Sequence, residues 1–211
     1  SVVVPAHSGA KAGMAFFGQF VDHDITLSAS DTTSFLIEPF VDSLFETPSG
    51  EFVNMRTPAF DLDSVYGRGP FSGPSAAEGW YDNATGGKGL RFRFGIGSTG
   101  GLDFLRDALE DDRAFIGDPR NDENGMVGQI HRAIQQLHNA RVDHILERDG
   151  IDEETLVPNS PEWRAVFHEA RNYTNAYYQG IVGNQFALFL TGRTAELILV
   201  GGTNVYPAEI D

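Results

Sequence analysis

Two long runs of apolar residues at helical spacing in the second half of the chain limit its fold more than any other feature. The first run extends from a turn at 117–124 to about Glu147. Its apolar positions are Val127, Ile130, Ile134, Leu137 and Ile145. Recurrence every three or four residues is typical of a helix with one buried face. The second run opens on Ser160-Pro161, an N-cap followed by proline, and extends to about Phe189. The chain is therefore predicted to be mainly α.

The first half predicts one further helix between long irregular loops. Residues 12–26 are apolar on more than one face, which is typical of a buried helix. Residues 28–56 and 68–101 are rich in Ser, Thr, Asp, Pro and Gly and are predicted as loops, with a short strand at 90–94.

No internal repeat or domain boundary is visible, so residues 1–211 are predicted to form a single domain. A short helix is expected at 194–199, inside a tail at 193–211 whose packing stays open. Both ends read as mid-protein sequence, and we therefore expect an incomplete domain, part of a longer protein.

Composition excludes several classes of function. A formal net charge of -15 argues against a nucleic-acid partner. The absence of cysteine excludes disulfides, thiolate catalysis and zinc–thiolate sites. No apolar run reaches the roughly 18 residues that span a bilayer, so we expect no membrane span. The sequence leaves the compartment open and favours an extracellular one.

A histidine between two carboxylates lies inside the first predicted helix. Gln19, Asp22 and His23 are spaced i, i+3 and i+4, so they share one helix face, while Asp24 is turned toward another neighbour. An amide, an acid and an imidazole on one face are suited to proton chemistry. A hydrogen-bonded structural histidine is the alternative.

A short acidic loop follows at Thr57-x-Ala59-x-Asp61-x-Asp63. Alternate residues of an extended segment point to the same side, which brings hydroxyl, carbonyl and carboxylate oxygens together. Such hard oxygen ligands suit Ca²⁺, although the spacing is not that of an EF-hand. A solvated acidic loop is the alternative.

A third motif joins Arg120 and Glu123, three residues apart at a predicted helix start. The helix dipole favours an acid there, and Arg120 has Asp118 and Asp122 as nearby partners for a simple ion pair.

Taken together and in order, these motifs resemble the animal-type haem peroxidases, the peroxidase-cyclooxygenase superfamily, and especially its bacterial members. Two later signatures, at 137–141 and 169–182, are similar to those of the same family. The resemblance covers roughly residues 12–192 and implies a helical haem peroxidase-like fold with long loops.

The resemblance implies a haem b site. His23 would be the distal histidine, which takes a proton from hydrogen peroxide and returns it to the leaving oxygen, and Arg120 would stabilise the charge that develops. Gln19 would orient water or halide. Asp22 and Glu123 match the carboxylates that form ester bonds to haem in family members. Halides or small organic molecules would be the electron donors.

The resemblance also implies a Ca²⁺ site behind the haem pocket. Its ligands would be Asp24, Thr57, the carbonyl of Ala59, Asp61 and Asp63. A calcium ion there would tie the helix of His23 to the acidic loop and fix the position of the imidazole.

The sequence departs from the family pattern in two places. Asn124 stands where some mammalian members have a methionine linked to haem, so no sulfonium bond is expected. The proximal histidine, which binds the iron, is expected beyond Asp211, in a missing C-terminal half. A calcium-stabilised module without catalysis, or a truncated remnant, is therefore the alternative to a peroxidase. A metal-dependent phosphohydrolase using the pair His23-Asp24 is a further one.

Overall fold

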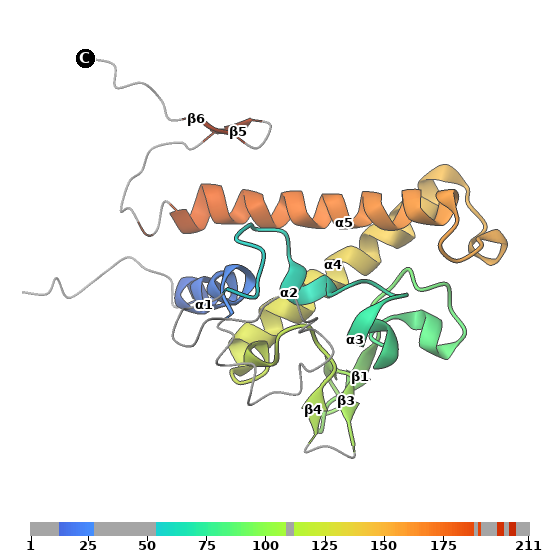
Figure 1. The fold of residues 1–211 in the computed structure, drawn as a ribbon, viewed down its shortest axis with the longest axis horizontal. Coiled ribbons are helices and arrows are strands. Elements are labelled where there is room, and N and C mark those ends of the chain that lie inside the picture. The colour runs from blue at the N-terminus through green and yellow to red at the C-terminus, as the bar shows by residue number, and fades with distance from the viewer. Residues whose placement is uncertain are drawn as a thin grey trace, which may run out of the picture.

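The protein is described here by a computed structural model, which describes residues 13–27, 54–108, 112–187 and 190, together with the backbone of 198–200 and 203–205. Three helices dominate this part: α1 (Gly13–Ile25), α4 (Gly125–Asp149) and α5 (Pro161–Ile181). Figure 1 shows α5 along one side of the molecule, with α4 running obliquely beneath it and α1 toward one end. The prediction of a mainly α protein is confirmed.

The long helices begin and end where the sequence places caps. The side chain of Asn124 accepts a hydrogen bond of 2.9 Å from the backbone N–H of Met126, and Gly150 ends α4 in the left-handed conformation at φ 61°. Ser160 accepts a hydrogen bond of 3.2 Å from the N–H of Trp163, with proline at the first position of α5. The predicted start of α5 at Ser160-Pro161 is confirmed.

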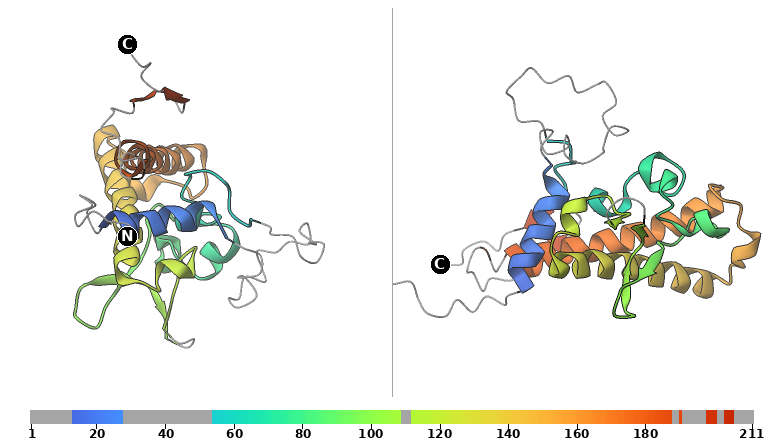
Figure 2. Two further views of the ribbon diagram at one scale, coloured as in Figure 1. Left: turned by 90° about the vertical axis from the view of Figure 1, so that its left-hand side faces the viewer. Right: turned by 90° about the horizontal axis from the view of Figure 1, so that it is seen from below.

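The helix α1 crosses the ends of α4 and α5, as the two views of Figure 2 show. The chain continues from α5 into a π-helical turn, η5 (Val182–Phe186), which also packs on α1. Phe17 contacts Tyr178 and Phe186 edge to face, with ring centroids 6.1 Å and 5.8 Å away. Phe20 contacts Tyr178 in the same way at 5.9 Å. These aromatic contacts fix α1 against the end of α5.

Short elements fill the segments between the helices. They are α2 (Asp63–Tyr66), α3 (Gly73–Ala77) and the 3-10 turns η2 (Asp82–Thr85), η3 (Pro119–Asn121) and η4 (Glu153–Thr155). The described residues also form three antiparallel strand pairs. These are β1 (Phe94–Ile96) with β2 (Leu102–Phe104), β3 (Arg106–Asp107) with β4 (Arg113–Ala114) and, after α5, β5 (Ile198–Val200) with β6 (Thr203–Val205).

Two predicted elements differ from the structure. The strand expected at 90–94 is only partly formed, since Phe92 makes an isolated antiparallel bridge with Tyr81 and the regular strand β1 begins at Phe94. The N–H and carbonyl of Phe92 are bonded to the side chain of Asn139. The helix expected at 194–199 is wrong for residues 198 and 199, because 198–200 form β5, which pairs with β6. The rest of that tail, and most of the loop predicted at 28–56, lie outside the described residues.

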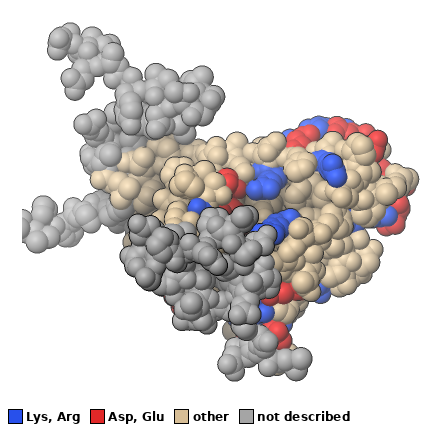
Figure 3. Space-filling model, in the orientation of Figure 1, with Lys and Arg blue, Asp and Glu red and all other residues tan. Residues whose placement is uncertain are grey.

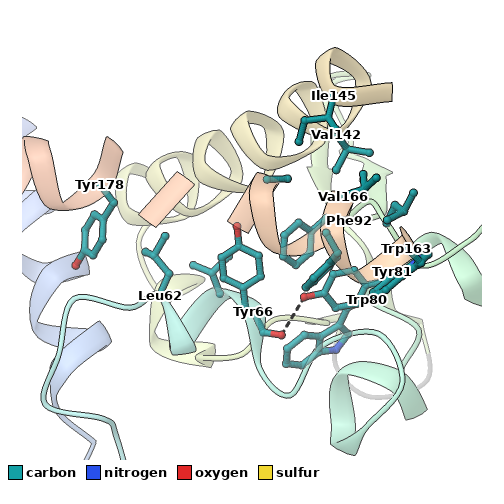
Figure 4. Close-up of a cluster of buried hydrophobic side chains, with 14 of the residues drawn as sticks. Leu62, Tyr66, Trp80, Tyr81, Phe92, Val142, Ile145, Trp163, Val166 and Tyr178 are labelled. Atoms are coloured by element: carbon teal, nitrogen blue, oxygen red, sulfur yellow. Dashed lines mark hydrogen bonds between the residues drawn. The ribbon is translucent and has the colours of Figure 1, made fainter. Parts of the chain in front are cut away.

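The core between α4, α5 and the loops is aromatic (Figure 4). Trp163 stacks on Phe167 with centroids 4.9 Å apart, and Tyr81 stacks on Phe92 at 4.5 Å. The hydroxyl of Tyr81 donates a hydrogen bond of 3.0 Å to the carbonyl of Tyr66. Rings of this size bury about 150–250 Å² each, so this cluster supplies much of the apolar stabilisation.

The charged side chains are unevenly placed on the surface. In the view of Figure 3, acidic and basic residues gather at the end where α4 joins α5, while most of the surface along α5 is uncharged. None of the helices in the described ranges is both long and apolar enough to cross a membrane.

Candidate functional site

His23 on α1 is buried, with 6% of its surface exposed, and it is held by a hydrogen bond across the fold. Its Nδ1 lies 2.8 Å from Oδ1 of Asn121 in η3, a residue 98 positions away in the sequence. The Nδ2 of Asn121 lies 3.0 Å from Nδ1 of His131 on α4. Both Asn121 and His131 are fully buried. The amide of Asn121 in η3 therefore links the imidazole of His23 on α1 to that of His131 on α4.

Two glycines allow the backbone to approach closely around this site. A Cβ on Gly117 would collide with the carbonyl of Ser64, where the segment before η3 passes α2. A Cβ on Gly128 would come within 3.2 Å of the carbonyl of Asn121, where α4 passes η3. Both positions are close enough that a larger residue would push η3 away from its neighbours.

Asp24, next along α1, is fully buried on the opposite side of His23. Its carboxylate accepts hydrogen bonds from the N–H of Leu62 at 3.2 Å and from the hydroxyl of Ser64 at 3.0 Å. Burial raises the pKa of Asp24 to about 6, and these two hydrogen bonds offset only part of that rise.

Asp24 lies beside two further carboxylates, those of Asp61 and Asp63, and one oxygen of each lies within 4.8 Å of the others. Burial also raises the pKa of Asp63, against the opposing charge of Arg56. Like charges at this distance repel one another, and a bound cation removes that repulsion. The structure therefore brings together three of the five residues predicted to bind Ca²⁺.

The acidic loop is folded around its own carboxylates. The N–H of Thr57 donates to Asp63 at 3.1 Å, and the N–H of Asp63 donates to Asp61 at 3.3 Å. Thr57 and Ala59 are exposed, and the carbonyl of Thr57 accepts a bond of 2.7 Å from the N–H of Ala59. Leu62 has a left-handed backbone with φ 59°, which is unusual for leucine and directs its N–H to Asp24.

Arg120 is directed at the end of α1. Its Nη2 donates to the carbonyls of Thr26 and His23, at 2.6 Å and 3.3 Å, and its guanidinium also pairs with Asp118 at 2.7 Å. A cation at this position complements the helix dipole and the last carbonyls of α1. The ion pair with Asp118, the simpler interpretation of the sequence motif, is present.

Asp118 joins the two halves of the site. It is fully buried and also accepts a bond of 2.8 Å from Arg56, whose other nitrogen lies 3.5 Å from Asp63. Burial alone would raise the pKa of Asp118, but the guanidinium groups of Arg120 and Arg56 outweigh it and lower the pKa. A continuous set of charges thus runs from Asp63 to Arg120.

The remaining predicted residues lie at the surface near His23. Asp22 and Glu123 are exposed, and Gln19 is half-buried. The carboxylate of Asp22 accepts a bond of 3.2 Å from the hydroxyl of Thr26. Because Asp22 adjoins His23 and Glu123 lies two residues after Asn121, the His23–Asn121 hydrogen bond places the segments that carry both acids side by side.

Sequence reasoning missed Asn121, His131, Arg56, Ser64 and Tyr178. Asn121 lies inside the motif at 117–123, and Ser64 directly follows the acidic loop. Their positions in the sequence could therefore have marked both as candidate site residues. The hydroxyl of Tyr178 is buried without a hydrogen bond to any described residue. Burial, and then the charge of Asp24, raise the pKa of Tyr178.

No protein-family model matches the chain, and no curated protein matches it. Among solved structures, it is similar to the crystal structure of a fatty acid alpha-dioxygenase from Arabidopsis thaliana, with a TM-score of 0.54 and 20% sequence identity. The match covers 86% of this chain and 28% of the dioxygenase chain. At this identity the likeness shows the fold, and the predicted helical, peroxidase-like fold is confirmed.

Proposed function

We propose that this chain forms the distal side of a haem site and acts in an oxidoreductase of the peroxidase type. The substrates of the proposed reaction are hydrogen peroxide and a halide or small organic electron donor. The chain shares its fold with a dioxygenase of the peroxidase-cyclooxygenase superfamily, which supports a haem enzyme more broadly than a peroxidase in particular.

The observation that carries the proposal is the setting of His23. Its Nδ1 is bonded to Asn121, and its Nε2 makes no hydrogen bond within the described part of the chain. A buried imidazole with one nitrogen fixed and the other available is the arrangement that general acid–base catalysis uses. Gln19, Asp22 and Glu123 around it retain exposed surface.

We infer that residues on the open side of His23 would lie against one face of a haem. Asp22 and Glu123 supply exposed carboxylates on the two segments that the His23–Asn121 bond joins, and they would help to hold the haem. The other described histidines have different surroundings. His138 is buried and bonded at both ring nitrogens, and His131 is buried and bonded at Nδ1. His144 and His168 are exposed on α4 and α5. A residue that binds the haem iron would then come from outside the described residues.

Bound haem would supply the iron that activates peroxide. The residues of this chain would handle the protons. His23 would accept a proton at Nε2 from peroxide while its Nδ1–H stays on Asn121, and would then return that proton to the leaving oxygen. Arg120, bonded to the carbonyl of His23 and paired with Asp118, would contribute its charge from behind the imidazole.

We also propose that the cluster of Asp24, Asp61 and Asp63 binds Ca²⁺. Asp24 adjoins His23 on α1, and the N–H of Leu62 and the hydroxyl of Ser64 already hold its carboxylate to the acidic loop. A cation there would fix α1 against that loop and so keep His23 in place.

Titration of the full chain with haemin, followed by peroxide-dependent oxidation of guaiacol, tests the proposal. We expect a shift of the Soret band on binding. Replacing His23→Ala should lower the rate by about 100-fold or more, since general acid–base groups contribute about 10²–10⁴-fold. His144→Ala, an exposed histidine on α4, is the matched control and should leave the rate unchanged.

An unshifted Soret band, or no oxidation in the presence of haemin, would rule out a peroxidase made of this chain alone. An equal rate in His23→Ala would reject the mechanism while leaving haem binding intact.

The second candidate is a calcium-stabilised helical module without catalysis. The cluster of Asp24, Asp61 and Asp63 favours it, because these carboxylates could bind Ca²⁺ whether or not the chain binds haem. A large rise in melting temperature with Ca²⁺, together with no haemin binding, would support this alternative and contradict the first.

A further inference from the structure

The hydrogen bonds between His23, Asn121 and His131 have a direction, because an amide has one accepting and one donating end. The Oδ1 of Asn121 only accepts, so the Nδ1 of His23 must carry the proton in their 2.8 Å bond. The Nδ2 of Asn121 only donates, so the Nδ1 of His131 must be bare in the 3.0 Å bond. One amide orientation therefore sets opposite tautomers in the two histidines.

His131 is suited to hold the amide in this orientation. It is fully buried and is enclosed by the rings of Phe20 and Phe104, with centroids 6.1 Å and 5.3 Å away. Burial lowers the pKa of His131 to about 3, so its imidazole stays neutral at ordinary pH. A neutral imidazole with a bare Nδ1 accepts from the amide N–H and leaves the amide oxygen for His23. The proton of His131 then lies on Nε2, which is buried without a hydrogen-bond partner among the described residues.

We propose that Asn121 is the positioning residue of the site, and that, oriented by His131, it fixes His23 in the Nδ1–H tautomer with Nε2 as the proton-accepting atom. This inference rests on the proposed function only for its catalytic meaning. The tautomers themselves are a property of the chain without haem.

If the side-chain amide of Asn121 were reversed, both histidines would have the opposite tautomers, and an experiment can distinguish the two cases. With Nδ2 toward His23, the Nδ1 of His23 would be bare and its Nε2 would carry the proton, and His131 would carry its proton on Nδ1. In that state the Nε2 of His23 is a donor and accepts no proton.

Nitrogen-15 NMR of the full chain without haem reads both tautomers directly. At about pH 9, where ordinary imidazoles are neutral, we expect a protonated Nδ1 and a bare Nε2 for His23, and the reverse for His131. His23→Gln and His131→Gln assign the signals, each by the set that disappears. A bare Nδ1 on His23 in the unsubstituted chain would overturn the proposal.

The substitution Asn121→Asp separates the two histidines. A carboxylate only accepts, so His23 keeps its protonated Nδ1, while His131 must move its proton to Nδ1 in order to donate. If the amide were reversed, His23 would change tautomer and His131 would not. Asn121→Leu, which offers neither donor nor acceptor, should give His23 the averaged signals of a free imidazole. Unchanged His23 signals in Asn121→Leu would also overturn the proposal.

Asn124→Asp is the matched control, since it makes the same change three residues along the chain. Aspartate remains a good N-cap for the N–H of Met126, so α4 should begin as before. Both histidine tautomers should stay as in the unsubstituted chain. If Asn124→Asp also changed a histidine tautomer, the tautomer changes in Asn121→Asp would be explained by the added negative charge, and this result would count against the proposal.

The catalytic consequence is measured separately on the haemin-loaded chain. Asn121→Leu should lower the rate of guaiacol oxidation by about 10–100-fold, the usual effect of losing the partner that orients a functional histidine, and Asn121→Asp should restore most of it. If haemin does not bind, the proposed function fails while the tautomer result stands. If haemin binds and the tautomers are wrong, only the role of Asn121 fails.

Discussion

The two acids that flank His23 have opposite environments on the same helix. Asp24 is fully buried, accepts hydrogen bonds from Leu62 and Ser64, and belongs to a cluster of three carboxylates. Asp22 is exposed, and its carboxylate accepts one hydrogen bond, from Thr26, among the described residues. Burial raises the pKa of Asp24 to about 6.

This difference gives one short helix a closed side and an open side. The side of α1 with Asp24 is closed by the acidic loop, so its polar groups are committed to internal partners. The side with Gln19 and Asp22 retains exposed surface. His23 lies between the two sides and is fixed by Asn121. The predictions below contrast the closed side with the open one.

The largest effect is expected at Asp118, which connects the two sides through Arg56 and Arg120. Asp118→Asn keeps the shape and removes the charge, leaving two partly buried guanidinium groups without their shared counter-ion. Breaking a buried ion pair costs about 3–5 kcal/mol of unfolding free energy. Denaturant unfolding measures this loss.

Asp103→Asn is the matched control. Asp103 also pairs with two arginines, Arg106 at 3.1 Å and Arg132 at 2.8 Å, but its side chain is 21% exposed. Pairs with this access to water contribute about 0–1 kcal/mol. Equal losses in the two variants would show that burial does not distinguish Asp118.

The second prediction concerns the pH dependence of stability at Asp24. A folded-state pKa of about 6 against an ordinary 3.8 means that the folded protein keeps this proton to higher pH than the unfolded chain. Its contribution to stability is therefore present at low pH and is lost as pH rises through about 4 to 6, by about 3 kcal/mol. Asp24→Asn removes this loss.

The measurement is the difference in unfolding free energy between Asp24→Asn and the unsubstituted chain, without divalent cations. This difference should rise by about 2.4 kcal/mol from about pH 4 to about pH 7 in favour of the variant. A difference that stays constant with pH would show that Asp24 is not desolvated as the structure indicates.

The helices and the acidic cluster were within reach of the sequence because their signals are local. Ser160-Pro161 marks the start of α5 by itself, and alternate carboxylates at Asp61 and Asp63 indicate an oxygen-ligand site. The sequence also separated Asp24 from the face of His23, which helical spacing decides. The sequence did not predict which of these two helix faces would be buried by other parts of the chain.

Long-range pairings were out of reach. The bond from His23 to Asn121 joins residues 98 positions apart, and nothing in the local pattern of His131 distinguishes it from the exposed His144 on the same helix. Arg120 shows the same limit, since its motif gives its identity but not the direction of a long side chain. Its choice of the carbonyls of Thr26 and His23 depends on where α1 ends.

The third prediction is the response of the closed side to Ca²⁺. Binding to the folded state alone stabilises by about 2.7 kcal/mol when free Ca²⁺ is about 100 times its Kd. For a chain of this length that corresponds to a rise in melting temperature of about 5–10 °C. Melting curves with Ca²⁺ and with a chelator measure it, and Asp63→Asn should remove most of the rise. A melting temperature indifferent to Ca²⁺ would contradict the proposed site.

The smallest effect on stability is expected on the open side, at Asp22. Asp22→Asn keeps an acceptor for the hydroxyl of Thr26 and lies at the surface, so unfolding free energy should change by no more than about 0.5 kcal/mol. The Ca²⁺ response and the tautomer of His23 should also be unchanged. An effect of Asp22→Asn is expected only after treatment with haemin and peroxide. The amount of haem that remains attached to the denatured chain should then be lower in the variant. A stability loss comparable to that of Asp118→Asn would mean that the open side is also structural, and the two sides of α1 would then not differ in role.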